Sequence, residues 1–168
     1  RLERGQLARI EALLDSPLVR REPRRLLLDL RGTGGRDERL AYEIAGLFAD
    51  GEMGQLSARG EAVERFTDSR PDLFRGELVV LVDRSTIGPG ELLARALRAR
   101  AGARIVGEPS FGYTGREESV ELAGGAHLRL ATAFFTGPDG VVETEGIAPD
   151  LEVEEQGGRF GEKDVPLS

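Results

Sequence analysis

The sequence predicts an α/β domain, and three observations support this prediction. Short apolar runs alternate with amphipathic helical segments, and glycine-rich turns follow several of the apolar runs. The length of 168 residues and the hydrophobic content of 39% suit one ordinary domain with a single core. Ligands in such folds bind at the turns that follow the strands.

The first half of the chain is predicted to contain two helices separated by a strand. Apolar residues recur at spacings of three and four over residues 6–15, which predicts an amphipathic helix. The leucine run within residues 24–31 predicts a buried parallel strand, and residues 38–50 predict a second helix. Residues 51–76 are polar and weakly periodic, which is compatible with either a hairpin or a mobile loop.

The next segments repeat the strand–helix pattern. Residues 78–82 form the clearest buried strand, residues 91–101 form a helix rich in Leu, Ala and Arg, and residues 103–106 form the next strand. The two strands extend the predicted parallel sheet, and the helix connects them.

The last third of the chain reads mainly as strands. A hairpin is predicted from residues 119–122 and 127–133, joined by a turn at Gly124-Gly125. Residues 147–153 close the core, and residues 154–168 are predicted to be a C-terminal tail.

Composition excludes several classes of function. The 23 basic and 30 acidic residues give a formal charge of −7, and no basic stretch exceeds two residues, which argues against nucleic-acid binding. The absence of cysteine excludes disulfides, thiol catalysis and cysteine-based zinc sites, and a single histidine excludes a histidine-rich metal site. No apolar run approaches the ~18 residues of a membrane span. We therefore expect no metal, no cofactor, no nucleic acid and no membrane span.

Three glycine-rich turns are the candidate ligand-binding segments: residues 32–35, 84–90 and 107–115. Their backbone amides could bind an anion or an oxyanion, although glycine also simply permits tight turns. Neither a dinucleotide fingerprint nor a P-loop is present. Three carboxylates flank these turns and could equally serve as caps: Asp29, Asp83 and Glu91.

Hydroxyl nucleophiles are available in these turns, but bases are scarce. Ser85, Thr86 and Ser110 lie in or near the turns, and each would need a base within hydrogen-bond reach. The one histidine, His127, lies in a predicted strand where a structural or surface role is the alternative, and the one lysine, Lys163, lies in the predicted tail.

Five segments, in order, resemble the core of the C-terminal processing (tail-specific) serine peptidases. They are residues 26–35 (LLLDLRGTGG), 80–97 (VLVDRSTIGPGELLARAL), 104–112 (RIVGEPSFG), 130–140 (LATAFFTGPDG) and 146–150 (GIAPD). The resemblance implies a ClpP/crotonase-like fold of ββα units, with a buried β-sheet and flanking helices, over residues 1–153. It further implies that the family's PDZ domain is absent from this chain. Because members of the family are mostly exported, an exported, periplasmic or envelope-associated location is also implied.

The same resemblance locates the family's catalytic positions on residues that cannot perform the chemistry. The family's serine nucleophile corresponds to Gly88, its lysine base to Tyr113 and its orienting glutamine to Glu117. The family's oxyanion hole combines an amide of the glycine turn, here Gly34-Gly35, with the amide of the residue after the serine. That residue is Pro89, which has no N–H.

These substitutions favour a binding or scaffold domain that has lost Ser–Lys proteolysis and captures peptides or the C-terminal segments of unfolded proteins. One alternative is a serine-type hydrolase with a rebuilt site, in which Ser85, Thr86 or Ser110 is activated by His127 or Glu117. A second alternative is a crotonase-like acyl-thioester enzyme, which would also use paired glycine-turn amides. No acid/base pair or CoA-phosphate patch specifically supports that last hypothesis.

Overall fold

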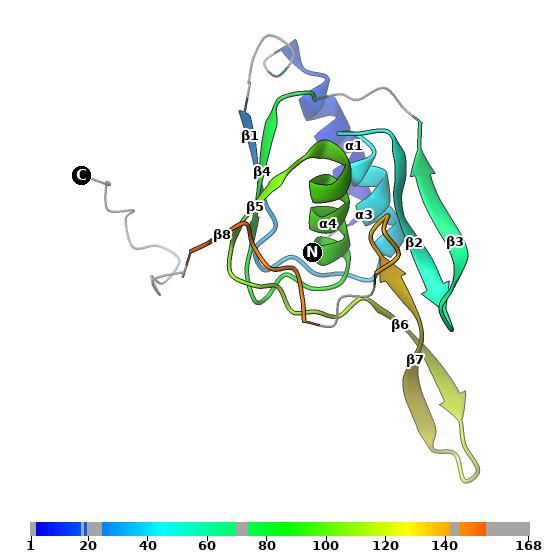
Figure 1. The fold of residues 1–168 in the computed structure, drawn as a ribbon. Coiled ribbons are helices and arrows are strands. Elements are labelled where there is room, and N and C mark those ends of the chain that lie inside the picture. The colour runs from blue at the N-terminus through cyan, green and yellow to red at the C-terminus, as the bar shows by residue number, and fades with distance from the viewer. Residues whose placement is uncertain (1–2, 18, 20–24, 70–73, 142–144, 154–168) are drawn as a thin grey trace.

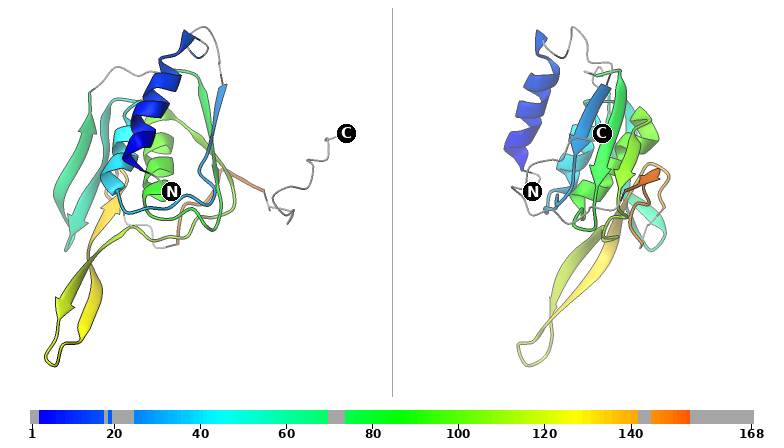
Figure 2. Two further views of the ribbon diagram at one scale, coloured as in Figure 1. Left: turned by 180° about the vertical axis from the view of Figure 1, so that it is seen from behind. Right: turned by 90° about the vertical axis from the view of Figure 1, so that its left-hand side faces the viewer.

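Two β-sheets with helices between them form the domain (Figures 1 and 2). The computed structural model describes residues 3–17, 19, 25–69, 74–141 and 145–153. Helices and both sheet types are present, so the predicted α/β class is confirmed. The predicted tail, residues 154–168, lies outside the described residues.

The first sheet is parallel and has the order β1-β4-β5-β8. Its strands are β1 (Arg25–Asp29), β4 (Glu77–Val82), β5 (Arg104–Gly107) and β8 (Leu151–Glu152). Alternate residues of β4 (Leu78, Val80 and Val82) are buried, because one face of the sheet packs against the core. The prediction of a buried strand was wrong for β1, whose residues alternate between exposed and half-buried. Of the predicted closing segment 147–153, only Leu151–Glu152 forms a strand. Pro149 has no N–H to donate, and the Asp150 N–H donates to the carbonyl of Ile105 in β5 at 2.8 Å.

The second sheet is antiparallel and has the order β3-β2-β7-β6. Its strands are β2 (Gly51–Ala58), β3 (Glu61–Asp68), β6 (Gly115–Glu121) and β7 (His127–Thr136). The segment 51–76 therefore contains a hairpin, which turns at Arg59 and Gly60 with positive φ angles of 53° and 86°. Its periodicity is weak because register shifts between Glu52 and Gly54 and between Leu56 and Ser57 interrupt the alternation.

The helices are α1 (Arg4–Leu14), α3 (Glu38–Ala45) and α4 (Pro89–Ala101). Helices α3 and α4 pack on each other between the two sheets, and α1 contacts α3 (Figure 1). The prediction of a helix to residue 50 was wrong in extent, because α3 is capped at Gly46. Leu47 and Phe48 are buried in the following turn, so their apolar character extended the helical pattern beyond the helix.

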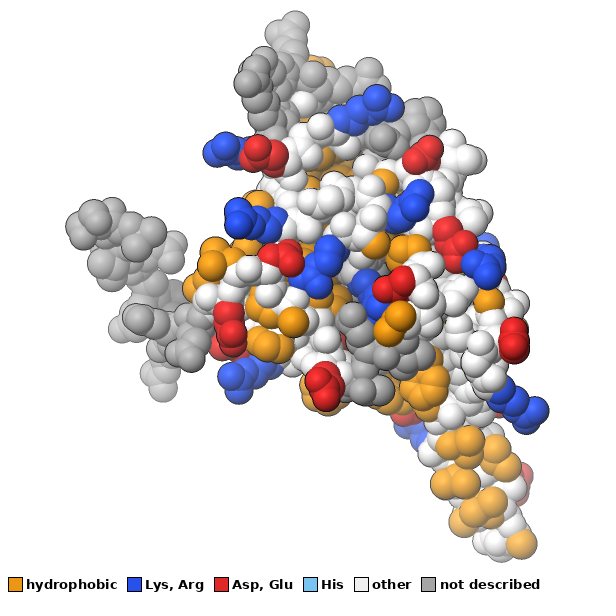
Figure 3. Space-filling model, in the orientation of Figure 1, with side chains coloured by type: hydrophobic (Ala, Val, Ile, Leu, Met, Phe, Trp, Pro, Cys, Tyr) orange, Lys and Arg blue, Asp and Glu red, His pale blue; other side chains and the backbone are white. Residues whose placement is uncertain are grey.

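The predicted β6–β7 hairpin is confirmed, and it projects from the body of the domain (Figures 1 and 2). Its outer part carries exposed apolar side chains (Figure 3), at Val120, Leu122, Leu128 and Leu130. The opposite end of the hairpin, at Gly115 and Phe134, joins the body beside the beginning of α4.

Candidate functional site

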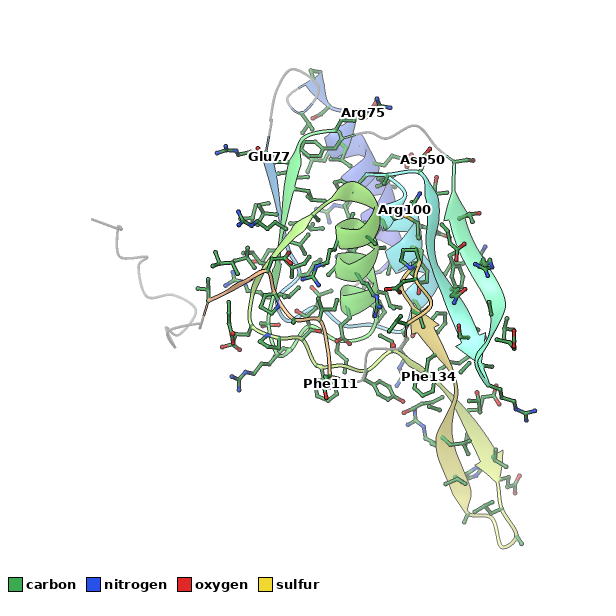
Figure 4. All side chains as sticks on the ribbon, in the orientation of Figure 1. Asp50, Arg75, Glu77, Arg100, Phe111 and Phe134 are labelled. Atoms are coloured by element: carbon green, nitrogen blue, oxygen red, sulfur yellow. The ribbon has the colours of Figure 1, made fainter. Side chains whose placement is uncertain are left out.

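The three glycine-rich turns meet at the end of the parallel sheet where α4 begins. The Ile87 N–H donates to the carbonyl of Thr33 at 2.9 Å, which joins the first turn to the second. The Phe111 N–H donates to the carbonyl of Thr86 at 3.0 Å, which joins the second turn to the third. Figure 4 shows Phe111 at this end of the molecule, away from Arg100 at the other end of α4. Strands that run parallel bring their following turns to one edge, which is the physical reason for this convergence.

A groove of about 430 Å³ opens between these turns and the base of the hairpin. Gly35 contributes to it from the first turn, Gly88 and Pro89 from the second, and Tyr113 from the third. The same turns also contribute Ile87, Thr114 and Gly115, and neighbouring segments contribute Arg36, Glu38, Arg116, Glu117, Arg129 and Phe135. The positions that the family resemblance assigned to the nucleophile, the base and the orienting residue therefore share one groove.

Gly88 has a backbone conformation that favours glycine. It is the N-cap of α4, with φ 57° and ψ −113°, and Pro89 follows as the first helical residue. A Cβ added to Gly88 would lie 3.6 Å from the carbonyl oxygen of Tyr113, which is an ordinary contact distance. Space for a side chain is thus present, but the residue provides no nucleophile and Pro89 provides no amide donor.

Glu91 connects the second glycine-rich turn to the third. Its side chain is buried, with 2% of the residue exposed. The carboxylate caps the Gly88 N–H of its own helix at 2.9 Å, which confirms the expected capping role. It also accepts hydrogen bonds from a second loop: from the Ser110 hydroxyl at 2.5 Å, the Gly112 N–H at 2.6 Å and the Tyr113 N–H at 3.0 Å. One carboxylate therefore sets the distance between Gly88 and Tyr113.

Tyr113, which the family resemblance assigns to the position of the base, acts as a hydrogen-bond donor. Its hydroxyl donates to Oε1 of Glu117 at 2.6 Å, and Arg129 donates to Oε2 of the same carboxylate. The hydrogen bond to Glu117 raises the pKa of Tyr113 above its ordinary value of 10.0. The same bond, together with the charge of Arg129, lowers the pKa of Glu117 below its ordinary value of 4.5. Near neutral pH the pair is thus a neutral phenol and an ionised carboxylate, and the phenol is a poor proton acceptor.

We expect Glu117→Ala to lower the pKa of Tyr113 towards 10.0, because the substitution removes the acceptor that holds the phenol protonated. The measurement is a titration of tyrosinate absorbance. The other tyrosine, Tyr42, does not interfere, because burial raises its pKa well above this range. The raised pKa stabilises the folded state below pH 10.0, and this contribution is lost as the pH rises through the folded value. Glu118→Ala is the matched control, because it removes the same kind of side chain from the next position of β6, which lies on the other face of the hairpin with Leu130. Identical titrations in both variants and the parent would refute the assigned contact.

The other candidate nucleophiles do not line the described groove. Thr86 is fully buried, and its hydroxyl lies 3.0 Å from both the Leu30 carbonyl and Oδ1 of Asp83. The Ser110 hydroxyl donates to Glu91 and accepts from the Ile147 N–H at 2.7 Å. Both hydroxyls therefore serve the packing of the turns. Ser85 is exposed on the turn after β4.

His127 lies at the outer end of the hairpin, where it is paired with Glu121. It is exposed and does not contribute to the described groove. The geometry therefore gives no support to a site that combines His127 with Ser85, Thr86 or Ser110. Glu117, the other proposed base, has both carboxylate oxygens occupied by Tyr113 and Arg129.

Three arginines of the groove were not identified as site residues from the sequence: Arg36, Arg116 and Arg129. They come from the segment directly after the first glycine turn, from β6 and from β7, so no local motif connects them. A partial signal was available in the predicted hairpin, because counting outward from Gly124-Gly125 places Glu117 and Arg129 on one face. The role of Glu91 across two loops had no local signal, because Ser110, Gly112 and Tyr113 are 19 to 22 residues away.

No group of three or more His, Cys, Asp or Glu side chains among the described residues could hold a metal ion. No helix in the same part of the chain is long and apolar enough to cross a bilayer.

Comparison with known proteins provides independent information about the family. The model of peptidase family S41 matches residues 8–153. The carboxyl-terminal-processing protease of Picosynechococcus sp. is 32% identical over 128 residues, which are 75% of this chain and 31% of that protein. The nisin-resistance protein of Lactococcus lactis is 23% identical over 158 residues, which are 83% of this chain and 49% of that protein. The chain thus spans between about a third and a half of the length of these two relatives.

Solved structures agree with this result. The photosystem II D1 C-terminal processing protease has a TM-score of 0.78 and 25% identity, over 90% of this chain and 40% of that chain. A lipoprotein from Streptococcus agalactiae, at 18% identity and a TM-score of 0.67, shares the fold. The predicted fold class is therefore confirmed by structural similarity as well as by the elements themselves. Since the family model matches residues 8–153 of a chain of 168, the chain belongs to peptidase family S41.

Proposed function

We propose that this domain has lost Ser–Lys proteolysis and binds peptides, or the C-terminal segments of unfolded proteins, in the groove beside Gly88. The observation that carries the proposal is the composition of that groove at the family's catalytic positions. Gly88, Pro89, Tyr113 and Glu117 line it together, and each lacks the group that the family's mechanism requires there.

The size of the expected loss can be estimated from the missing groups. Removing one oxyanion donor costs on the order of 100- to 1,000-fold in rate. Removing the nucleophile or base of a serine peptidase costs on the order of a millionfold, and such losses are not additive. The substitutions at Gly88, Pro89 and Tyr113 affect all three groups, so no measurable proteolysis by this mechanism is expected.

Peptide binding is supported by the position of a free strand edge. Strand β6 is the last strand of the antiparallel sheet and pairs only with β7 within the described residues. Its first residues, Gly115, Arg116 and Glu117, line the groove, so a peptide entering the groove can add to this edge. Several relatives are named as C-terminal processing proteases, which is consistent with a groove that accepts protein C-termini.

Fluorescence anisotropy with a labelled, unstructured peptide that ends in apolar residues tests the proposed binding. We expect saturable binding that Thr114→Trp weakens, because Thr114 lines the groove and an added indole would fill it. Glu11→Trp adds the same group at an exposed position of α1 outside the groove and should leave binding unchanged. Absence of binding to the parent protein, or equal losses in both variants, would contradict the proposal.

We expect Gly88→Ser to fold and to remain without proteolytic activity. A serine Cβ has room there, at a cost of about 1 to 3 kcal/mol for a backbone conformation that L residues rarely adopt. Activity is not expected, because Pro89 still lacks an N–H and Tyr113 still donates its hydroxyl proton to Glu117. The measurement is casein cleavage, with an active C-terminal processing protease as the positive control. Measurable cleavage by the variant would show that the base has been assigned to the wrong residue.

A further inference from the structure

The groove carries an excess of positive charge within an acidic chain. Three arginines (Arg36, Arg116 and Arg129) and two glutamates (Glu38 and Glu117) line it, whereas the whole chain has a formal charge of −7. The local sign is thus opposite to that of the protein. An excess of charge in a partly enclosed groove favours ligands of the opposite sign.

The pairing within the groove leaves two of the arginines available. Arg129 is bonded to Glu117, whose other oxygen accepts the hydroxyl of Tyr113. Arg36 and Arg116 have no hydrogen bond or ion pair to a side chain within the described residues, although Arg36 is close enough to contribute to the lowered pKa of Glu117.

Arg116 is held in place without using its hydrogen-bond donors. Its guanidinium carbon lies 5.5 Å from the centre of the Phe135 ring, which is buried and also lines the groove. A cation–π contact of this kind orients the guanidinium, and its N–H groups stay free to bind a ligand. The planar donors of arginine match the two oxygens of a carboxylate.

The remaining glutamate does not neutralise this pair of arginines. Glu38 lies in the first turn of α3, where a carboxylate interacts favourably with the helix dipole. It contributes one negative charge to the groove against the two positive charges of Arg36 and Arg116, so the groove keeps a net attraction for an anionic group.

We infer that the groove selects peptides by a carboxylate, which Arg36 and Arg116 bind. This inference rests on the proposed peptide-binding function and specifies its ligand class. The carboxylate can be the free C-terminus of the peptide or an acidic side chain, since both present the same two oxygens.

The test measures the anisotropy of one labelled, unstructured peptide that ends in apolar residues, in four forms. The first two are the free acid and the C-terminal amide, and the other two are amides that carry either an internal Glu or a Gln at the same position. The parent protein is expected to bind a form with a carboxylate about three- to tenfold more tightly than its neutral counterpart, as for a partly exposed arginine–carboxylate contact. This preference should decrease with added salt. The arm that shows the preference identifies the source of the carboxylate.

Arg36→Gln and Arg116→Gln should each reduce this preference, and the double variant should abolish it. Arg104→Gln is the matched control, because it removes the same charge from an exposed residue of β5 outside the groove and should leave the preference unchanged. Equal binding of charged and neutral peptides by the parent protein would overturn the inference while the peptide-binding function stands. An equal loss in Arg104→Gln would also overturn it, since the effect would then follow net charge alone. If no form of the peptide binds, the proposed function fails and the inference fails with it.

Discussion

Replacing Glu91 with alanine is expected to lower the free energy of unfolding by about 3 to 5 kcal/mol. The buried carboxylate accepts hydrogen bonds from Gly88, Ser110, Gly112 and Tyr113, and alanine leaves these donors without their acceptor. Hydrogen bonds to a charged group contribute more than neutral ones, and a donor left buried without a partner adds a desolvation cost. The measurement is urea unfolding of the parent and the variant with a common slope.

Glu91→Gln separates the loss of hydrogen bonds from the loss of packing. The amide keeps the shape of the side chain, but one of its two polar ends is a donor and opposes a pair of N–H or O–H groups. Glu91→Gln is therefore expected to lower the free energy of unfolding, but by less than Glu91→Ala does. If Glu91→Ala changes the unfolding free energy by less than about 1 kcal/mol, the carboxylate does not hold the two loops together as described.

Gly146→Ala is expected to destabilise the domain by about 2 to 4 kcal/mol. Gly146 has a φ of 82°, and a Cβ built on it would lie 2.2 Å from the carbonyl oxygen of Ser110. Because that oxygen belongs to the backbone, the Ser110 loop would have to move away from the segment that carries Ile147. The same movement would disturb the contact of Ser110 with Glu91.

Gly125→Ala is the matched control for backbone strain. Gly125 has a similar φ of 78° in the hairpin turn, and no described atom outside its immediate neighbours lies within 4 Å of an added Cβ. Its expected cost is about 1 kcal/mol. Equal losses of stability in Gly146→Ala and Gly125→Ala would mean that the contact with Ser110 has no consequence and that positive φ alone explains both.

Much of the fold could be predicted from the sequence, because strong local patterns determine its central elements. The apolar run at β4 and the helix after it have clear periodicity, and the Gly124-Gly125 turn fixed the β6–β7 hairpin. The sequence did not distinguish the β2–β3 hairpin from a mobile loop, because its bulges disrupt the alternation that identifies strands. The sequence predicts an end of α3 beyond the observed one, because buried residues in the following turn keep the apolar spacing of a helix.

The candidate site was only partly accessible from the sequence. The glycine turns predicted its location, and the family resemblance named Gly88, Pro89, Tyr113 and Glu117, which the structure brings into one groove. The contacts that shape the groove join residues far apart in the chain. The bond between Arg129 and Glu117 and those between Glu91 and the 110–113 loop depend on tertiary structure, which no local pattern encodes.

The most direct test of the proposed loss of Ser–Lys proteolysis is mass spectrometry of an unstructured peptide after prolonged incubation with the parent protein. An active C-terminal processing protease serves as the positive control, and Ser85→Ala tests the exposed serine of the site turns. We predict that the peptide remains intact with the parent protein and is cleaved by the control protease. Cleavage at a defined bond by the parent protein, lost in Ser85→Ala, would contradict the account and assign a rebuilt catalytic site to this domain.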